Sequence, residues 1–144
     1  MLVSHILKSK ADETVVTVMP STTIAQAAYM LSERRIGTLI VSRDGLAPDG
    51  ILSERDIVRE LGRSGAASLA EPVSSIMTAK LVTCSRDMRA DMVLEQMTEG
   101  RFRHMPVLED GVLVGLISLG DVVKARLMEL AMEKDALEGM IRGH

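Results

Sequence analysis

Residues 103–124 read RHMPVLEDGVLVGLISLGDVVK, and this stretch decides the fold. A basic pair precedes a short apolar run, and an Asp-Gly turn follows it. A second apolar run then ends in Ser118-x-x-Asp121, where a helical pattern begins. Residues 50–59 read GILSERDIVR and repeat the second half of this arrangement. Two copies of Gly-apolar-apolar-Ser-x-x-Asp-apolar-Val in one short chain predict a duplicated unit.

The part of each copy that precedes this motif also repeats. Val3–Leu7 align with Val73–Met77 at an offset of 70 residues. Val16-Thr17 align with Val82-Thr83 at an offset of 66. The loop Lys8–Glu13 of the first copy is therefore four residues longer than its counterpart, because 70 minus 66 is 4.

Each copy continues with one amphipathic helix and two strand-like runs. Apolar residues recur at i, i+3, i+4 and i+7 in both predicted helices. Thr23-x-x-Gln26 predicts a capping box at the start of the first one. Asp-Gly turns follow the strand-like residues 38–41 and 104–107. The apolar stripes are Ile24, Ala27, Ala28 and Leu31 in the first copy and Ala90, Val93, Leu94 and Met97 in the second.

The order in each copy is short helix, strand, helix, strand, strand, helix, which predicts an α/β (α+β) fold. From Gly50 and Gly115 onward the offset is 65, so the first copy holds one extra residue near Pro48. Because proline cannot donate a ladder hydrogen bond, we expect that hairpin to be frayed or to lie at a sheet edge. A unit of about 60 residues buries too little surface to be stable alone, so we expect the two copies to pack sheet to sheet.

The predicted domain boundaries follow the repeat. Residues 1–62 form the first repeat with an N-terminal helix, and residues 63–72 form a Gly-, Ser- and Ala-rich linker. Residues 73–144 form the second repeat with an extended C-terminal helix. That helix is predicted over residues 119–141. It either covers only its own core or also forms a dimer surface. We favour the dimer surface, because so long a helix extends beyond so small a domain. Its near-a/d apolar residues are Val123, Leu127, Leu130, Leu137 and Ile141, with Lys134 interrupting.

Composition excludes several classes of protein. The chain has 144 residues, 47% of them hydrophobic, and a net charge of −3, which argues against a general nucleic-acid binder. The single Cys84 cannot form an internal disulfide, and its strand-like neighbourhood predicts a buried, inert thiol. The Cys and His spacings suggest no metal site, and no apolar run or leader pattern suggests a membrane span or a signal peptide. We therefore expect a soluble cytoplasmic protein.

The combined motifs resemble a tandem pair of cystathionine beta-synthase (CBS) domains, a Bateman module of the small stand-alone bacterial type. The resemblance runs from about Val3 to Leu130 and is strongest at residues 50–59, 72–78 and 101–124. It implies two pseudo-symmetric β-α-β-β-α repeats packed through their sheets, two clefts between them, and dimerisation. Family members bind AMP, ADP, ATP, NAD or S-adenosylmethionine and act as sensors or regulators.

The two aspartates are the predicted ribose-binding residues. A carboxylate can accept hydrogen bonds from both ribose hydroxyls, and such charge-assisted bonds are strong. Asp56 and Asp121 each lie in the first turn of a predicted helix, with Ser53 and Ser118 as additional hydroxyl contacts. The alternative is that each Ser-x-x-Asp is a capping box, with serine as N-cap and an acidic residue at N3.

The phosphate and adenine assignments follow the resemblance. Arg103, His104, Lys124 and Arg55 are the predicted phosphate-binding residues, although Gly37-Thr38 replaces the basic pair in the first copy. The alternative for each arginine is a solvated surface side chain, and for the apolar adenine residues it is ordinary core packing. The predicted adenine residues are Val16, Ile36, Gly37 and Thr38 for the Asp121 cleft, and Thr78, Val82 and Phe102 for the Asp56 cleft.

The sequence thus predicts a non-catalytic regulatory module that binds an adenine nucleotide (AMP, ADP, ATP or NAD). It contains no legible Ser/His/Asp or Cys/His arrangement for catalysis. Expected partners are a second copy of the chain and a separate regulated protein, with no nucleic acid and no membrane. The rival hypotheses are a dimeric interaction module without a ligand and a small enzyme that acts on nucleotides.

Overall fold

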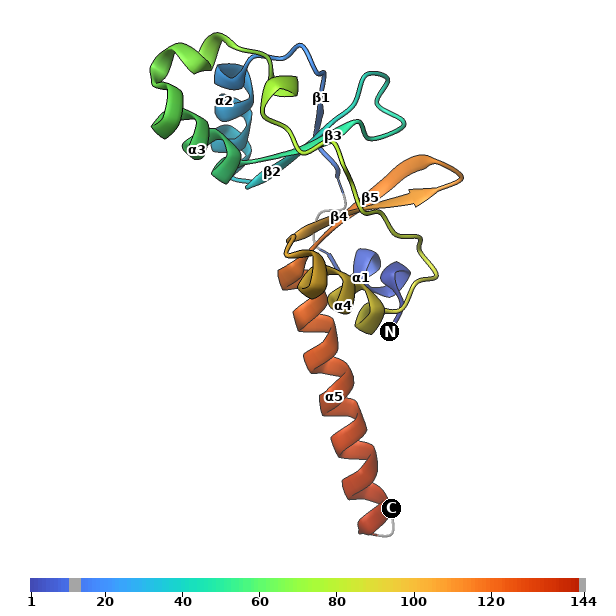
Figure 1. Ribbon diagram of the computed structural model, residues 1–144. Helices are drawn as coiled ribbons and strands as arrows, with labels where there is room; N and C mark the ends of the chain where they lie inside the picture. Colours follow the sequence, from blue (N-terminus) through green and yellow to red (C-terminus); the bar gives the residue numbers. More distant parts are fainter. Residues whose placement is uncertain (11–13, 143–144) are drawn as a thin grey trace. The chain divides into compact units, whose positions relative to one another are not determined.

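The computed structural model describes residues 1–10 and 14–142 (Figure 1). It contains helices and strands in the order expected of an α/β chain, which confirms the predicted fold class. The chain forms two compact units, which we name after their aspartates. The Asp56 unit comprises Thr14–Val82 and Glu109–Val114, and the Asp121 unit comprises Met1–Glu13, Thr83–Leu108 and Gly115–His144. The predicted longer loop, Lys8–Glu13, lies partly outside the described residues.

The Asp56 unit is built on a three-stranded sheet. Its elements are β1 (Thr17–Val18), α2 (Ile24–Arg34), β2 (Thr38–Val41), β3 (Gly50–Ser53) and α3 (Glu54–Ser64). β2 is central, parallel to β1 and antiparallel to β3. All four of its residues are buried, as expected for a strand covered on both faces. The predicted capping box at the start of α2 is confirmed, since Thr23 accepts from the Gln26 N–H at 3.1 Å.

The Asp121 unit also carries a helix, two strands and a second helix in that order, preceded by a short N-terminal helix, although residues 109–114 at the turn between the two strands fall in the Asp56 unit. Its elements are α1 (Val3–Ser9), α4 (Ala90–Gly100), β4 (His104–Glu109), β5 (Val112–Ser118) and α5 (Leu119–Ile141). β4 and β5 form a two-stranded sheet. The predicted Asp-Gly turn joins them with positive φ at both positions, 52° and 78°, as a type I′ hairpin requires.

The strand predicted around Val82–Cys84 is reduced to one bridge. Cys84 pairs with Val107 in parallel, and its N–H donates to the Pro106 carbonyl at 3.0 Å. Subtracting the offset of 66 places this bridge at Val18 and Val41, which are the residues that pair in β1 and β2. The repeat offset read from the sequence therefore has a structural counterpart, although the second copy keeps a single rung of the ladder.

Each unit takes its leading segment from the other sequence repeat. The Val3 N–H donates to the Met88 carbonyl at 2.9 Å, and the Val73 N–H donates to the Thr22 carbonyl at 2.8 Å. These two bonds are equivalent under the repeat offsets, so the two leading segments are exchanged reciprocally. The matching isolated bridges are Leu2–Arg89 and Thr23–Pro72. The division into residues 1–62, 63–72 and 73–144 remains a prediction about the repeats in the sequence.

The connection between the repeats is helical over most of its length. α3 continues to Ser64, and a 3-10 helix, η1, covers Ala66–Ala70. Between them Gly65 has a φ of 76°, a conformation that glycine adopts without steric cost. Ser68 is buried and its hydroxyl donates to the Gly65 carbonyl at 2.7 Å. η1 packs against α2 and α3, and a second 3-10 helix, η2, follows at Val73–Ser75.

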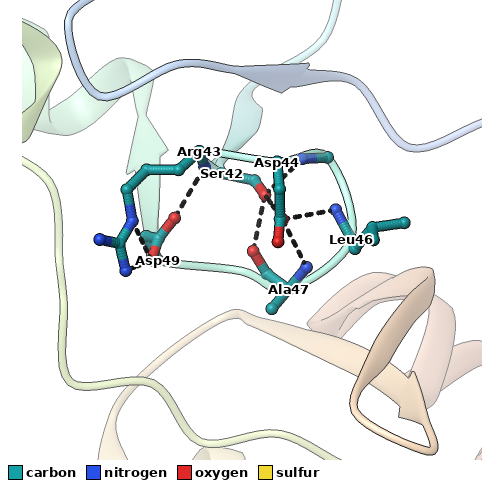
Figure 2. Close-up of polar contacts among 7 residues, drawn as sticks. Ser42, Arg43, Asp44, Leu46, Ala47 and Asp49 are labelled. Atoms are coloured by element: carbon teal, nitrogen blue, oxygen red, sulfur yellow. Dashed lines mark hydrogen bonds and ion pairs between the residues drawn. The ribbon is translucent and has the colours of Figure 1, made fainter.

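The loop between β2 and β3 is closed by its own polar groups (Figure 2). The Ser42 hydroxyl donates to the Ala47 carbonyl at 2.6 Å, and Asp49 accepts from the Arg43 N–H at 2.7 Å. These bonds compensate for the missing donor of Pro48, and pairing of β2 with β3 continues to Gly50. The prediction that this hairpin is frayed or lies at a sheet edge is confirmed in its second form, because β3 is one of the two outer strands of the three-stranded sheet.

α5 extends well beyond the elements that it contacts. Val122 and Ala125 in its first turns are buried, and the helix packs against α4 and α1. From Leu130 onward its residues are exposed or partly exposed. Within the described part of the chain, no helix combines the length and apolar character needed to cross a bilayer.

Candidate functional site: two carboxylates at helix N-termini

Asp56 lies in the first turn of α3 and is tied to the residue that begins the helix. Its Oδ2 accepts from the Ser53 N–H at 2.8 Å, and the Asp56 N–H donates to the Ser53 hydroxyl at 3.3 Å. This reciprocal pair is a capping box, so the structure confirms the alternative role predicted for the Ser-x-x-Asp motif. Arg59, one turn later, places a guanidinium nitrogen 3.6 Å from Oδ1, but its side chain is 73% exposed.

Asp121 repeats this arrangement at the start of α5. Its Oδ2 accepts from the Ser118 N–H at 2.9 Å, and its own N–H donates to the Ser118 hydroxyl at 3.1 Å. The cation here comes from a distant part of the chain, since Lys10 Nζ lies 3.0 Å from Oδ2. Burial alone would raise the pKa of Asp121, but the Ser118 N–H and the Lys10 ammonium together lower that pKa below 3.8.

Capping does not use the whole of either carboxylate. The cap bonds of both residues end on Oδ2, and the side chains of Asp56 and Asp121 keep 15% and 25% of their surface exposed. A carboxylate oxygen has more than one lone pair, so capping and binding a hydroxyl are chemically compatible. The structure thus confirms the capping role, and the ribose role remains a prediction for both aspartates and both serines.

A backbone carbonyl joins each helix start to the strand beside it. The Glu54 N–H donates to the Gly37 carbonyl at 2.9 Å, and the Leu119 N–H donates to the Arg103 carbonyl at 2.8 Å. Gly37 and Arg103 correspond under the offset of 66. The structure therefore brings one predicted adenine residue to the start of α3 and one predicted phosphate residue to the start of α5.

The predicted phosphate residues fall into two groups. Arg103 and His104 lie beside the start of α5, whereas Lys124 and Arg55 are exposed on helix surfaces. Burial lowers the pKa of His104 below 6.5, with Lys10 and Arg103 adding to the effect and Asp121 opposing it. At neutral pH His104 can therefore hydrogen-bond to a phosphate without contributing a positive charge.

The predicted adenine residues are dispersed. Val16 and Ile36 are partly buried against the core of the Asp56 unit, as expected if they are ordinary core residues. Thr38 is buried. Val82 is 43% exposed. Thr78 is exposed and exchanges two backbone hydrogen bonds of 2.9 Å with Ile51. These residues belong to the Asp56 unit, whereas Phe102 belongs to the Asp121 unit and lies over Gly100.

A groove of about 540 Å³ lies between α2 and α3 of the Asp56 unit. Two predicted adenine residues, Ile36 and Gly37, contribute to it, and the Glu54 carboxylate lies beside Gly37. Asp56 does not line this groove. The remaining lining residues are Ala28, Leu31, Ser32, Arg35, Ile57 and Val58.

Lys10 is the residue of this site that sequence reasoning missed. Besides its contact with Asp121, its ammonium donates to the Leu116 carbonyl at 2.8 Å. A signal was present, because Lys80 occupies the equivalent position at an offset of 70. Recognising its meaning required knowing that residues 1–10 belong to the same unit as Asp121. Among the described residues, no group of three or more His, Cys, Asp or Glu side chains could hold a metal ion.

A family profile described as the CBS domain matches residues 3–63 and 73–128. A mitochondrial CBS domain-containing protein of Arabidopsis thaliana, CBSX3, is 32% identical over 98% of this chain and 72% of its own length. Other matched plant relatives are longer, and the chain spans 22% of their length.

Solved structures show the same fold. The CBS-domain containing protein ATU1752 from Agrobacterium tumefaciens is 46% identical, with a TM-score of 0.81, over 88% of this chain and 99% of that one. The CBS domain protein PAE2072 from Pyrobaculum aerophilum, solved in complex with AMP, is 28% identical, with a TM-score of 0.78, over 92% of this chain and 99% of that one.

Proposed function

The chain belongs to the CBS-domain family, and we propose that it is a non-catalytic regulatory module that binds adenosine-containing nucleotides. The proposed ligands are AMP, ADP, ATP or NAD. Asp56 and Asp121 accept the ribose hydroxyls, with Ser53 and Ser118 beside them. Arg103 and His104 bind the phosphate at the Asp121 site. A separate protein is regulated by the nucleotide-bound form of the chain.

One observation carries this proposal. Both repeats present a partly exposed carboxylate at the third position of a helix that follows Gly-apolar-apolar-Ser. A vicinal diol offers two donors to such an acceptor, and the nearby helix N-terminus favours a negatively charged phosphate. A capping role alone does not require aspartate at N3 in both copies, because another N3 side chain can accept from the N-cap N–H, as Gln26 does at the start of α2.

The similar protein solved with AMP supports the choice of ligand class. PAE2072 and this chain share the two-repeat fold over 92% of this chain. We infer that an adenine nucleotide is the ligand here too. Signalling then requires that the ligand bind two arrangements of the protein with different affinities, because that difference limits the shift in population.

Isothermal titration calorimetry of ligand-free protein with AMP, ADP, ATP, NAD and S-adenosylmethionine tests the proposal. Saturable binding of at least one of them is expected, and chromatography of the mixture should recover the nucleotide unchanged. Folded protein that binds none of the five would contradict nucleotide binding. Steady product formation would instead favour the enzyme hypothesis.

The exposed end of α5 favours a second candidate function, an interaction module. Leu130, Leu137 and Ile141 are 49%, 60% and 86% exposed. Large apolar side chains clustered at heptad-like spacing on one helix are typical of helix pairing. We propose that this face pairs two copies of the chain, and such a dimer is compatible with nucleotide binding.

A further inference from the structure

The two carboxylate sites differ in the cation that accompanies them. Asp56 has a guanidinium from its own helix at 3.6 Å, on a side chain that is 73% exposed. Asp121 has the ammonium of Lys10 at 3.0 Å, on a side chain that is 26% exposed. The shorter, more buried contact is the stronger interaction.

The position of Lys10 is fixed by a second contact. Its ammonium also donates to the Leu116 carbonyl at 2.8 Å. Leu116 corresponds to Ile51 at the offset of 65, and the Ile51 carbonyl instead accepts from the Thr78 N–H at 2.9 Å. A side-chain ammonium thus takes, in the Asp121 unit, the carbonyl that a backbone N–H takes in the Asp56 unit.

The equivalent lysine makes no such contact. Lys80 is exposed, and among residues 1–10 and 14–142 no carboxylate pairs with it. The exchange of leading segments places Lys10 in the Asp121 unit and Lys80 in the Asp56 unit. Both copies therefore contain the lysine, and the two sites differ because Lys10 contacts the aspartate of its unit whereas Lys80 does not.

From this geometry we propose that Lys10 determines ligand specificity at the Asp121 site, favouring phosphorylated over uncharged adenosine compounds. The inference rests on the proposed nucleotide function. The ammonium neutralises much of the charge on the Asp121 carboxylate, which makes that carboxylate a weaker acceptor for ribose hydroxyls, so Lys10 weakens the binding of adenosine itself. A phosphorylated ligand meets the same weakened acceptor but gains attraction to the ammonium, whose long flexible side chain lets it move from the carboxylate toward the phosphate.

Titrations of adenosine and AMP into the full chain, followed by NMR, test this assignment. The Gly120 amide, in the first turn of α5, reports on the Asp121 site, and the Arg55 amide, in the first turn of α3, reports on the Asp56 site. In Lys10→Met, adenosine should bind about threefold tighter at Gly120, the size expected for losing a partly exposed ion pair. The preference for AMP over adenosine at Gly120 should fall by about the same factor or more.

Two further variants separate specificity from structure. Lys10→Arg keeps the charge and should keep the wild-type preference, and Lys80→Met is the matched control that should leave Gly120 unchanged. An unaltered AMP preference in a folded Lys10→Met protein would overturn the inference. Lys10 would then have only a structural role in the N-terminal segment, and nucleotide binding itself would be unaffected. If neither adenosine nor AMP shifts Gly120 in any variant, the proposed function fails at this site and the inference fails with it.

Discussion

Gly115 lies against Leu7, so that a Cβ built on Gly115 would come within 2.8 Å of the Leu7 Cδ2 atom. The equivalent pair in the other unit is Gly50 and Met77, where a Cβ would come within 2.9 Å of the Met77 Cγ atom. The glycine of each Gly-apolar-apolar-Ser motif thus lies beneath the last apolar residue of an exchanged leading segment. This packing explains why both motifs begin with glycine.

Gly50→Ala and Gly115→Ala should both destabilise the fold, but unequally. A Cβ at position 50 would also approach the Thr78 carbonyl at 3.1 Å. Thr78 cannot move away easily, because its backbone is hydrogen-bonded to Ile51. Gly115 faces only the flexible end of Leu7 at such short range. We expect a loss of ~2–3 kcal/mol for Gly50→Ala and ~1 kcal/mol for Gly115→Ala, in the range for overpacking. Urea unfolding measures both, and equal losses would contradict this account.

Local features could be predicted from the sequence because they depend on residues close together in the chain. Periodicity located α2, α4 and α5, and the Thr23-x-x-Gln26 spacing located a cap that the structure contains. The offset of 66 that relates Val16-Thr17 to Val82-Thr83 also relates the Val18–Val41 pair to the Cys84–Val107 bridge. Each of these signals is a property of one helix, one turn or one strand, so it can be recognised without knowledge of the tertiary structure.

Long-range features could not be predicted in the same way. The exchange of leading segments depends on which repeat each segment packs against, and both repeats offer similar surfaces. The Lys10–Asp121 pair follows from that exchange, so it was invisible for the same reason. The strand around Cys84 shortened to one bridge because burial and pairing, more than propensity, decide strand length.

His104 should make the fold less stable in mild acid. Burial lowers the native pKa of His104 below 6.5, so the unfolded chain binds more protons between the native pKa and 6.5. Its contribution to stability is therefore fully present above pH 6.5 and is lost as the pH falls through the native pKa. An NMR titration of the ring should give a pKa below 6.5, and His104→Gln should reduce the fall in melting temperature between about pH 7 and pH 5. A ring pKa above 6.5 in the folded protein would contradict this account, because His104 would then stabilise the fold as the pH falls.

Cys84 should be unreactive in the folded protein. Burial raises the pKa of its thiol to about 12, so almost none is thiolate at neutral pH. Labelling with a thiol reagent at pH 8 should be slow in buffer and rapid in denaturing urea, since opening of the fold then limits the rate. Rapid labelling without denaturant would show that the site around the Cys84–Val107 bridge opens freely.

Leu137→Glu should dissociate the proposed dimer. Leu137 is 60% exposed in the single chain, and burying a leucine contributes roughly 1.5–3 kcal/mol. Light scattering should show a dimer for the wild type and a monomer for this variant, with unchanged circular dichroism. Asp135→Lys, at an exposed position of the same helix away from the apolar stripe, is the control and should remain dimeric. A monomeric wild type would exclude pairing through α5.

The affinity for AMP of Asp56→Asn, Asp121→Asn and the double variant tests the central claim most directly. Both aspartates are N3 residues, and the side-chain carbonyl oxygen of asparagine can still accept from the Ser53 or Ser118 N–H, so the fold should be retained. Because a hydrogen bond to a charged group is stronger by ~1 kcal/mol than a neutral one, each change should weaken AMP binding at its own site by about fivefold. Calorimetry should then find binding in the double variant too weak to saturate at concentrations that saturate the wild type. Unchanged AMP affinity in a folded double variant would show that these carboxylates cap helices and hold no sugar.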